Sequence, residues 1–485
     1  MVSFATLILT LVSGTYPVEL IVDRAVAAVE MRLDGEVVGR LTAEPWRLNV
    51  DFGETLRPHE LEAIAIDARG RELARVRQMV NLPRSPAEVA LFLERGDDGR
   101  FRSARAVWEA ASDVEVQEVR ALLDGSPVQV TGRGRITLPP HSGDELHYLV
   151  VQVRFDGDLR AEAAIAFGGR FGASSHTEIT SVAVTLRKGV DELPSGSLDG
   201  WFRLRGKPVR VVAVERPPAG VLLVRDRSAE ALLGALASRL RRHSLADRVG
   251  VRDGLRRGDS VYLMDAVPRS SDRNDRDLTT WLFPVSPDLA GFGRGRGIAW
   301  TLTNLKLGDR NRGRARIAQA VAAAGLRAAG SGRPRAVVLL LGPAAAEHGR
   351  HRPRDVLAYL ETLQVPFSVW AVGRGVDSTL AEHWGGAIDV SDPDGLHAAV
   401  DGLRALLDRQ RIVWLEGQLL PQRIELSDSA RKHVERAGAR TAGAERRDAN
   451  ADQRPVRNPV RDLLVGVLRH RPDSMHHGSC GPGRP

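Results

Sequence analysis

The feature that most constrains the fold is an alternation of apolar strands and amphipathic helices between residues 221 and 410. The runs 221–226 (VLLVRD) and 335–342 (RAVVLLLG) are almost wholly apolar, which is typical of strands buried on both faces. In chain order, the other predicted elements are helix 228–243, strand 261–267, helix 315–329, helix 355–364, strand 366–373 and helix 395–408. Strands that alternate with helices predict a doubly wound parallel sheet with helices on both faces.

The preceding residues have a different pattern. Residues 15–83 alternate between apolar and polar with period two, in short runs between polar turns, which predicts a β-sandwich. Leu33-Asp34-Gly35 marks a hairpin, because Asp-Gly adopts the positive φ angles that tight turns need. Residues 86–168 repeat this plan around Leu123-Asp124-Gly125. Such a long period favours two tandem Ig-like sandwiches over a solenoid.

A third β-rich stretch at 176–216 precedes Pro217-Pro218. We therefore predict an all-β part followed by an α/β part. The expected boundaries are a possible signal peptide at 1–14, sandwiches at 15–85 and 86–170, a β-rich connector at 171–220, an α/β domain at 221–425 and a disordered basic tail at 426–485.

Charge and cysteine content limit the classes of function. The net charge is +8, but residues 431–485 hold twelve Lys/Arg and six Asp/Glu, which leaves only +2 on the other 430 residues. A nearly neutral folded part argues against a nucleic-acid partner. The single cysteine, Cys480, excludes an intrachain disulfide and a cysteine-based zinc site.

The N-terminal segment 1–14 (MVSFATLILTLVSG) has an apolar run as long as the core of a signal peptide, without a preceding Lys or Arg. It predicts export to an extracytoplasmic location, and the alternative is a first buried strand. No other segment reaches the roughly 18 apolar residues that a membrane-spanning helix needs.

The sequence VLLVRDRSAEALL (221–233) resembles the opening of von Willebrand factor A domains, in particular those of bacterial VWFA-related proteins. The Gly258-Asp259 turn before a strand, the run RAVVLLLG and the run PFSVWAVGRG (366–375) extend the resemblance over about 221–410. It implies a protein that binds other proteins through the loops at the carboxyl edge of the sheet. In that family a divalent cation, held by Asp-x-Ser-x-Ser, a Thr and a further Asp, bridges the domain to its partner.

This chain departs from the pattern of ligands. Asp226 and Ser228 match the first two positions, but Glu230 replaces the second Ser. Thr301 or Thr303 matches the threonine only by rough position, and Leu341-Gly342-Pro343 lacks the final Asp. We therefore expect a degenerate metal site without a bound cofactor, in which Mg²⁺ could be held only by Asp226 and Ser228. The expected contact surface consists of Asp226, Ser228, Glu230, Thr303 and the loop after Gly342.

Other motifs are candidates for catalytic or metal sites. Gly258-Asp259-Ser260 with Asp394 and His397 is similar to blocks of SGNH-type esterases, in which Ser260 would be the nucleophile and His397 the base. The blocks that would supply the oxyanion hole are missing, and the Ser precedes a strand instead of following one. Residues 347–355 contain Glu347, His348, His351 and Asp355, which we interpret as part of an exposed connection. The expectation is a non-enzymatic interaction, adhesion or scaffold protein, with a serine esterase as the alternative.

Overall fold

The computed structural model describes residues 2–438 with several gaps. These are residues 10, 23–25, 84–86, 97–100, 111–114, 142–146, 157–159, 168–178, 195–197, 237–255, 257, 269–282, 287–288 and 290–312. The predictions for Thr301, Thr303, Cys480 and the tail beyond residue 438 thus lie outside the described residues. Within the described part, no helix is both long and apolar enough to span a membrane.

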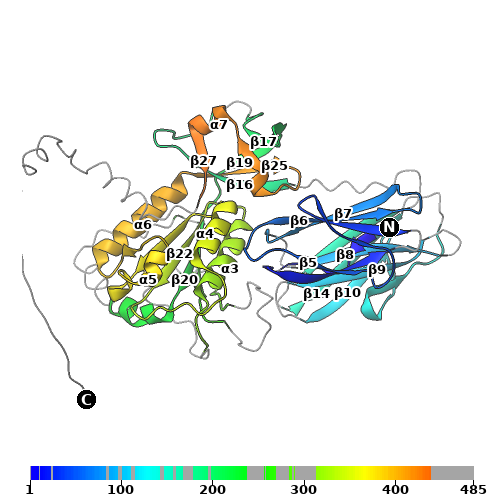
Figure 1. Cartoon of the computed structure of the whole chain (residues 1–485), viewed down its shortest axis with the longest axis horizontal. Helices are drawn as coiled ribbons and strands as arrows, with labels where there is room; N and C mark the ends of the chain where they lie inside the picture. Colours follow the sequence, from blue (N-terminus) through cyan, green and yellow to red (C-terminus); the bar gives the residue numbers. More distant parts are fainter. Residues whose placement is uncertain are drawn as a thin grey trace, which may run out of the picture. The chain divides into compact units, whose positions relative to one another are not determined.

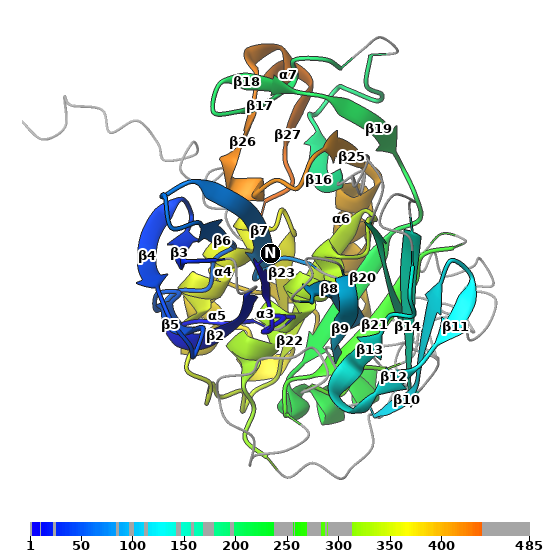
Figure 2. The same cartoon turned by 90° about the vertical axis from the view of Figure 1, so that its right-hand side faces the viewer.

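The first sandwich packs a sheet of order β1-β2-β5 against a sheet of order β4-β3-β6-β7. The strands are β1 (Val2–Phe4), β2 (Thr15–Val22), β3 (Ala28–Leu33), β4 (Glu36–Leu41), β5 (Arg47–Asp51), β6 (His59–Ile66) and β7 (Glu72–Val80). Every second residue of β3 and the centre of β6 face the core, where Met31, Leu61 and Ala63 are fully buried. Figure 2 shows β2 to β7 in shades of blue.

The segment predicted as a possible signal peptide belongs to this sandwich. Strand β1 pairs with β2 in the register Val2↔Val22. Val2, Phe4, Ile8 and Val12 are buried in the core of the sandwich. Residues 2–4 thus form a buried first strand, the alternative to a signal peptide, with Val2 and Phe4 alternating toward the core.

The second sandwich repeats the plan with sheets of order β12-β13-β9-β8 and β11-β10-β14-β15. Its strands are β8 (Ala87–Arg95), β9 (Phe101–Ala110), β10 (Val116–Leu123), β11 (Ser126–Val128), β12 (Val130–Thr131), β13 (Arg135–Thr137), β14 (His147–Phe155) and β15 (Arg160–Phe167). Asp34 and Asp124 have φ angles of 56° and 50°, and each following Gly is also positive. Both Asp-Gly pairs therefore form the predicted hairpin turns.

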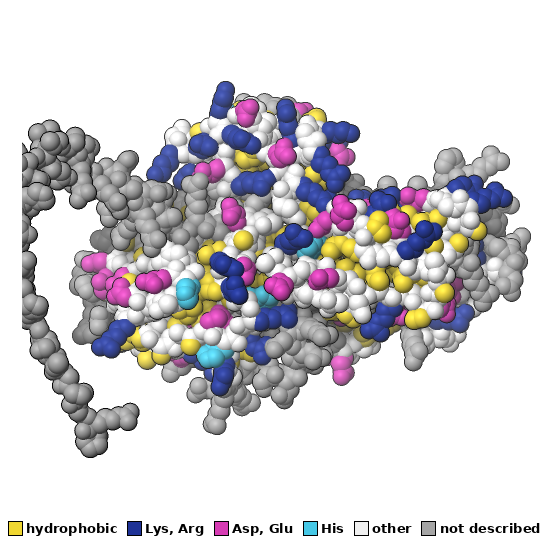
Figure 3. Space-filling model, in the orientation of Figure 1, with side chains coloured by type: hydrophobic (Ala, Val, Ile, Leu, Met, Phe, Trp, Pro, Cys, Tyr) yellow, Lys and Arg dark blue, Asp and Glu magenta, His cyan; other side chains and the backbone are white. Residues whose placement is uncertain are grey.

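A third sandwich, which the sequence did not predict, is assembled from two distant parts of the chain. Its sheets have the orders β19-β25-β16-β27 and β18-β17-β26. The elements are β16 (Ile179–Leu186), β17 (Phe202–Leu204), β18 (Lys207–Val209), β19 (Val211–Glu215), β25 (Gln410–Glu416), β26 (Ile424–Leu426), α7 (Asp428–His433) and β27 (Val434–Arg436). Figure 3 shows many Lys and Arg side chains over this part.

This assembly corrects two of the predicted boundaries. The central strand β16 pairs with β25 in the register Val182↔Val413, on the far side of the α/β domain. The strands between residues 179 and 215 therefore form half of a sandwich and are not a connector. The α/β domain ends near Asp408, and residues 426–438 are structured, not part of a disordered tail. Local patterns could not reveal this, because both halves read as ordinary short strands whichever partners they have.

The α/β domain is inserted between β19 and β25. All five strands of its sheet run parallel in the order β21-β20-β22-β23-β24. They are β20 (Gly220–Arg225), β21 (Ser260–Asp265), β22 (Arg335–Leu341), β23 (Phe367–Ala371) and β24 (Ile388–Asp389). The helices are 230–236, α3 (Ile317–Ala329), α4 (Pro353–Thr362), α5 (Thr379–His383) and α6 (Pro393–Asp408), with short 3₁₀ turns η3 (Arg227–Ala229) and η4 (Gly373–Gly375); the turn η5 (Pro421–Arg423) belongs to the third sandwich.

Helices cover both faces of this sheet, as predicted (Figure 1). One hydrophobic core joins α3 and α4 to the sheet, and a second joins residues 229–236 and α6 to its other face. Helix α3 is rich in alanine, and a Cβ at Gly325 would lie 2.1 Å from Leu360 of α4, so small residues permit this close packing. The first sandwich contributes Leu11 and Leu56 to the α3–α4 core.

The strand order reverses at one point of the sheet. The chain passes from β20 outward to β21 and then returns to β22 on the other side of β20. In parallel α/β sheets, ligands bind at the carboxyl ends of the strands where the order reverses in this way. That position here is the edge formed by the loops after β20 and β22.

Candidate functional site

Asp226 joins the loops that follow β20 and β22. Its Oδ2 accepts hydrogen bonds from the amide of Ser228 at 3.2 Å, from the Ser228 hydroxyl and from the amide of Gly342 at 3.3 Å. Ser228 Oγ in turn accepts from the amide of Ala344 at 3.2 Å. Asp226 is only 4% exposed. The structure thus brings Asp226, Ser228 and Gly342 together, and it uses the carboxylate to fasten one loop to the other.

Gly342 packs tightly against Ser228 and Ala229 in the loop that follows β20. A Cβ at this position would lie 2.2 Å from the Ala229 nitrogen and 2.4 Å from Ser228 Oγ. The position before it, where the resemblance requires an Asp ligand, is occupied by the fully buried Leu341 of the hydrophobic core. The residues present therefore do not fit the family's cation.

The other two carboxylates at this edge, those of Asp265 and Glu230, are paired with arginines of the same chain. Arg227 Nε and Nη2 both lie 3.1 Å from Oδ2 of Asp265, the last residue of β21. Asp265 is 2% exposed, and its other oxygen accepts from the Val267 amide at 2.9 Å. Arg225 Nη2 lies 3.6 Å from Oε2 of Glu230, so the residue that replaces the second Ser is paired with an arginine.

Sequence reasoning missed Asp265. The signal was present, because a lone carboxylate follows the apolar run VYLM. In the sheet, Asp265 is the register partner of Arg225, so it reaches the same edge as Asp226. What the sequence could not show was which arginine it would meet.

The loop after Gly342 continues into a buried polar group instead of the exposed connection that was predicted. Glu347 Oε2 accepts from the Ala318 amide at 2.7 Å, near the N-terminus of α3, and Oε1 accepts from the Gly349 amide at 2.6 Å. Burial raises the pKa of Glu347. His351 is 6% exposed, and burial lowers its pKa to about 4. The carboxylate thus anchors the loop to the start of α3, where the helix dipole favours negative charge.

The two residues of the alternative esterase occupy different ends of the domain. Ser260 begins β21, and its hydroxyl accepts from Arg333 Nη1 at 3.0 Å. The neighbouring Asp259 pairs with Arg404 of α6 at 2.6 Å. His397 lies seven residues before Arg404 on the same helix, which is about 10 Å along its axis. This arrangement makes no Ser–His pair and leaves no basis for the esterase mechanism.

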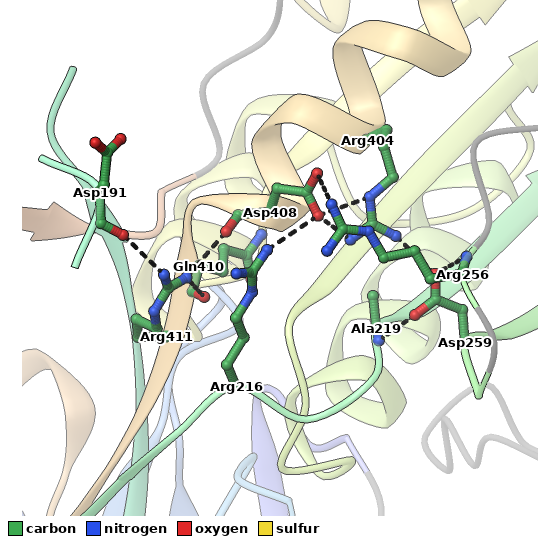
Figure 4. A network of polar contacts seen from close by, with 9 residues as sticks. All are labelled: Asp191, Arg216, Ala219, Arg256, Asp259, Arg404, Asp408, Gln410 and Arg411. Atoms are coloured by element: carbon green, nitrogen blue, oxygen red, sulfur yellow. Dashed lines mark hydrogen bonds and ion pairs between the residues drawn. The ribbon is translucent and has the colours of Figure 1, made fainter. Parts of the chain in front are cut away.

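Asp259 belongs to a polar network at the junction with the third sandwich, shown in Figure 4. Asp408, at the end of α6, pairs with Arg256 at 2.7 Å, with Arg216 at 3.5 Å and with Arg404. Arg411 donates to the carbonyl of Asp408 at 2.9 Å, and burial followed by the nearby charge of Arg216 lowers its pKa. The network joins α6, the strand β25 and the segments before β20 and β21, so its role is structural.

Among His, Cys, Asp and Glu side chains of the described residues, no group of three or more is placed to hold a metal ion.

Comparisons with known proteins give partial likenesses. No family model and no curated protein matches the chain. The fibronectin(III)-like modules of CbhA from Clostridium thermocellum match 37% of this chain and 100% of their own, at 16% identity and a TM-score of 0.15. The ArnB paralog VWA2 from Sulfolobus acidocaldarius matches 63% of this chain and 66% of its own, at 12% identity and a TM-score of 0.23. Proximal thread matrix protein 1 from the mussel byssus matches 44% and 51%, at 13% identity and a TM-score of 0.26.

The fold class itself follows from the sheets described above. The chain combines Ig-like β-sandwiches with a doubly wound α/β domain of von Willebrand A-like fold.

Proposed function

We propose that this chain is a non-enzymatic scaffold of the VWFA-related type, which binds a protein partner through the carboxyl edge of its α/β domain without a bridging cation. The observation that carries the proposal is the contact between Gly342 and the loop Ser228–Ala229. This close contact joins the two loops of the edge, and the buried Leu341 stands where the family's last Asp ligand would be.

The edge retains what a protein contact surface needs. Its two loops are held rigidly by the hydrogen bonds of Asp226 and Ser228, so little conformational entropy is lost when a partner binds. Pro343, Ala344 and Ala346 are exposed on the loop after β22 and present a small, largely apolar ledge. Glu230, with 40% of its side chain exposed, and Arg227, with 34%, border this ledge with opposite charges.

The charges also explain how such a surface works without metal. In the family, the cation offsets the carboxylates and attracts an acidic group of the partner. Here Arg225 and Arg227 offset Glu230 and Asp265 within the chain. The partner would therefore be recognised by shape and by ordinary polar contacts at the rim. Three β-sandwiches in one chain favour a place for this protein outside the cytoplasm.

The first arm of the test asks whether the edge binds a cation. The full chain is titrated with MgCl₂ and with MnCl₂ in a calorimeter, and its thermal unfolding is followed in parallel. We expect neither heat of specific binding nor a rise in Tm. Binding that disappears in Asp226→Asn would overturn the metal-independent mechanism.

The second arm asks whether the edge is the contact surface. Proteins captured by the full chain in the presence of EDTA are purified, and their affinity is measured one at a time. We expect Ala346→Arg, which places a bulky charge on the exposed ledge, to weaken a true partner by about 100-fold, or roughly 2.7 kcal/mol. Ala358→Arg on the exposed side of α4 is the matched control and should leave the affinity unchanged. Equal affinities of all three proteins would show that the edge is not the binding surface.

A further inference from the structure

Each of the two N-terminal sandwiches has a hairpin turn whose Asp is fastened to the start of a neighbouring strand, and we call this region the corner of the sandwich. The two corners can be compared position by position. In each, the Asp of the hairpin turn receives a hydrogen bond from the amide that follows a His, at Glu60 in the first and Tyr148 in the second. The registers Leu33↔Leu61 and Leu123↔Leu149 make Glu60 and Tyr148 equivalent. Differences between the two corners therefore reflect side chains on a common backbone.

The corner of the first sandwich is occupied by an arginine. Arg423, from the third sandwich, donates from Nη2 to the Asp34 carbonyl at 3.0 Å and pairs through Nη1 with Glu60 Oε2 at 3.0 Å. Its guanidinium also lies 3.7 Å from Asp34 Oδ1. The chain itself thus shows that a corner of this geometry accepts a guanidinium group.

In the second sandwich, the equivalent carboxylate belongs to Asp124 and is open to solvent. The Asp124 side chain is 44% exposed, although it is held by His147 at 2.7 Å. Tyr148, in the place of Glu60, is 53% exposed and offers an aromatic face instead of a second carboxylate. Guanidinium groups stack favourably on tyrosine rings. The hydrogen bond from His147, followed by that from the Tyr148 amide, lowers the pKa of Asp124, so this carboxylate is ionised at neutral pH.

At three equivalent positions beside the corner, the second sandwich has apolar residues where the first has charged ones. In the first, Glu62 pairs with Arg75 at 3.4 Å and Glu60 with Arg77 at 3.5 Å, so ion pairs cover part of an outer face that also carries the exposed Val37. The positions equivalent to Arg32, Glu62 and Arg77 in the second sandwich are Leu122, Val150 and Ala164. Leu122 and Val150 are partly exposed, Ala164 is exposed, and Pro127 of the edge strand β11 adds to this apolar surface.

We propose that this face of the second sandwich, made of Asp124, Tyr148, Leu122, Val150, Pro127 and Ala164, binds a protein segment that presents an arginine flanked by apolar side chains. The guanidinium pairs with Asp124 and stacks on Tyr148, while the flanking residues cover the apolar positions. This surface is separate from the edge of the α/β domain and does not depend on the function proposed for that edge.

The test uses a phage-displayed library of linear peptides, selected on the full-length chain and counter-selected on its Tyr148→Ser variant. Enriched peptides are synthesised, and their binding is followed by fluorescence anisotropy. We expect them to contain an arginine beside an apolar residue and to lose about tenfold in affinity when that arginine becomes lysine, because lysine cannot stack or bind in a fork.

Two variants of the chain locate the site. Tyr148→Ser and Asp124→Asn should each weaken the peptides about tenfold or more. Val116→Ser, at an exposed position near the start of β10, should have no effect on peptide binding. Thermal unfolding shows whether Asp124→Asn retains the fold, and Tyr148→Ser, which is exposed, serves as the test if it does not. The proposal is overturned if no peptide is enriched, if the peptides lack arginine, or if the face proves to bind a second copy of the chain, seen as dimers that Tyr148→Ser dissociates.

Discussion

Nδ1 of His59 lies 2.8 Å from Oδ2 of Asp34, and the same contact recurs in the second sandwich between His147 and Asp124 at 2.7 Å. In both cases the Asp occupies a turn position of positive φ, and the His begins the strand opposite it. The pair therefore fastens a hairpin turn to the neighbouring strand. Its recurrence supports an origin of the two sandwiches from one unit, beyond the short similarity of the Leu-Asp-Gly turns.

The first prediction concerns Asp34 and acid. Burial raises the pKa of this carboxyl, but the hydrogen bonds from His59 and the Glu60 amide, with the charges of His59 and Arg423, outweigh it and hold the pKa below the usual 3.8. A group with a lowered pKa stabilises the fold at pH values above its unfolded pKa, and this contribution is lost as the pH falls through the folded value. Asp34→Asn should therefore lower the free energy of unfolding at pH 7 by about 1–3 kcal/mol. The deficit should shrink below about pH 4, as measured by urea unfolding at several pH values. A deficit that is the same at pH 7 and pH 3 would contradict this origin.

A second pH effect should appear at less acidic values. Burial lowers the pKa of His351 from 6.5 to about 4, so this side chain is neutral in the folded chain and takes up a proton on unfolding. Between about pH 6.5 and 4 the unfolded state binds more protons, and stability should fall as the pH falls through this window. His351→Gln should remove most of that slope. His348→Gln, at an exposed position nearby, is the control and should retain the slope.

The third prediction tests the close approach of the two edge loops. Gly342→Ala should destabilise the chain by about 1–3 kcal/mol, because the added methyl group meets the Ala229 nitrogen and Ser228 Oγ. The matched control is Gly402→Ala on the exposed side of α6, where a Cβ meets nothing within 4 Å. Alanine favours a helix over glycine, so the control should stabilise by about 0.5–1 kcal/mol. Urea unfolding measures both, and equal effects would refute the close packing.

The fourth prediction concerns the N-terminal strand. Phe4 is 4% exposed in the core of the first sandwich. Phe4→Ala should cost about 3–5 kcal/mol, whereas Ser3→Ala on the same strand should change the free energy of unfolding by less than about 0.5 kcal/mol. Urea unfolding measures both variants, and equal effects of the two substitutions would contradict the burial of Phe4 in the core.

Local pattern was enough to predict several parts of this molecule. The alternation in 221–410 and the two Asp-Gly hairpins are encoded in neighbouring residues, so the parallel sheet and the turns could be recognised. Asp226, Ser228 and Gly342 could be placed at one edge because parallel strands end together. The third sandwich could not be predicted, since the pairing of Val182 with Val413 joins segments on either side of a whole domain. The same holds for the partners Arg227–Asp265 and Glu347–Ala318, which depend on how loops pack in three dimensions.

The insertion of the α/β domain also sets an order of events during synthesis. Strand β16 leaves the ribosome long before β25, its partner, exists, so the third sandwich cannot close until nearly all of the described chain has been made. The first two sandwiches and the α/β domain are each continuous in sequence and can fold as they emerge. When the α/β domain folds, its two ends are brought side by side, because Glu215 and Ile412 are register partners on β19 and β25. Much of the conformational entropy that closing so long a loop costs is therefore already lost when the α/β domain folds. The third sandwich then forms last.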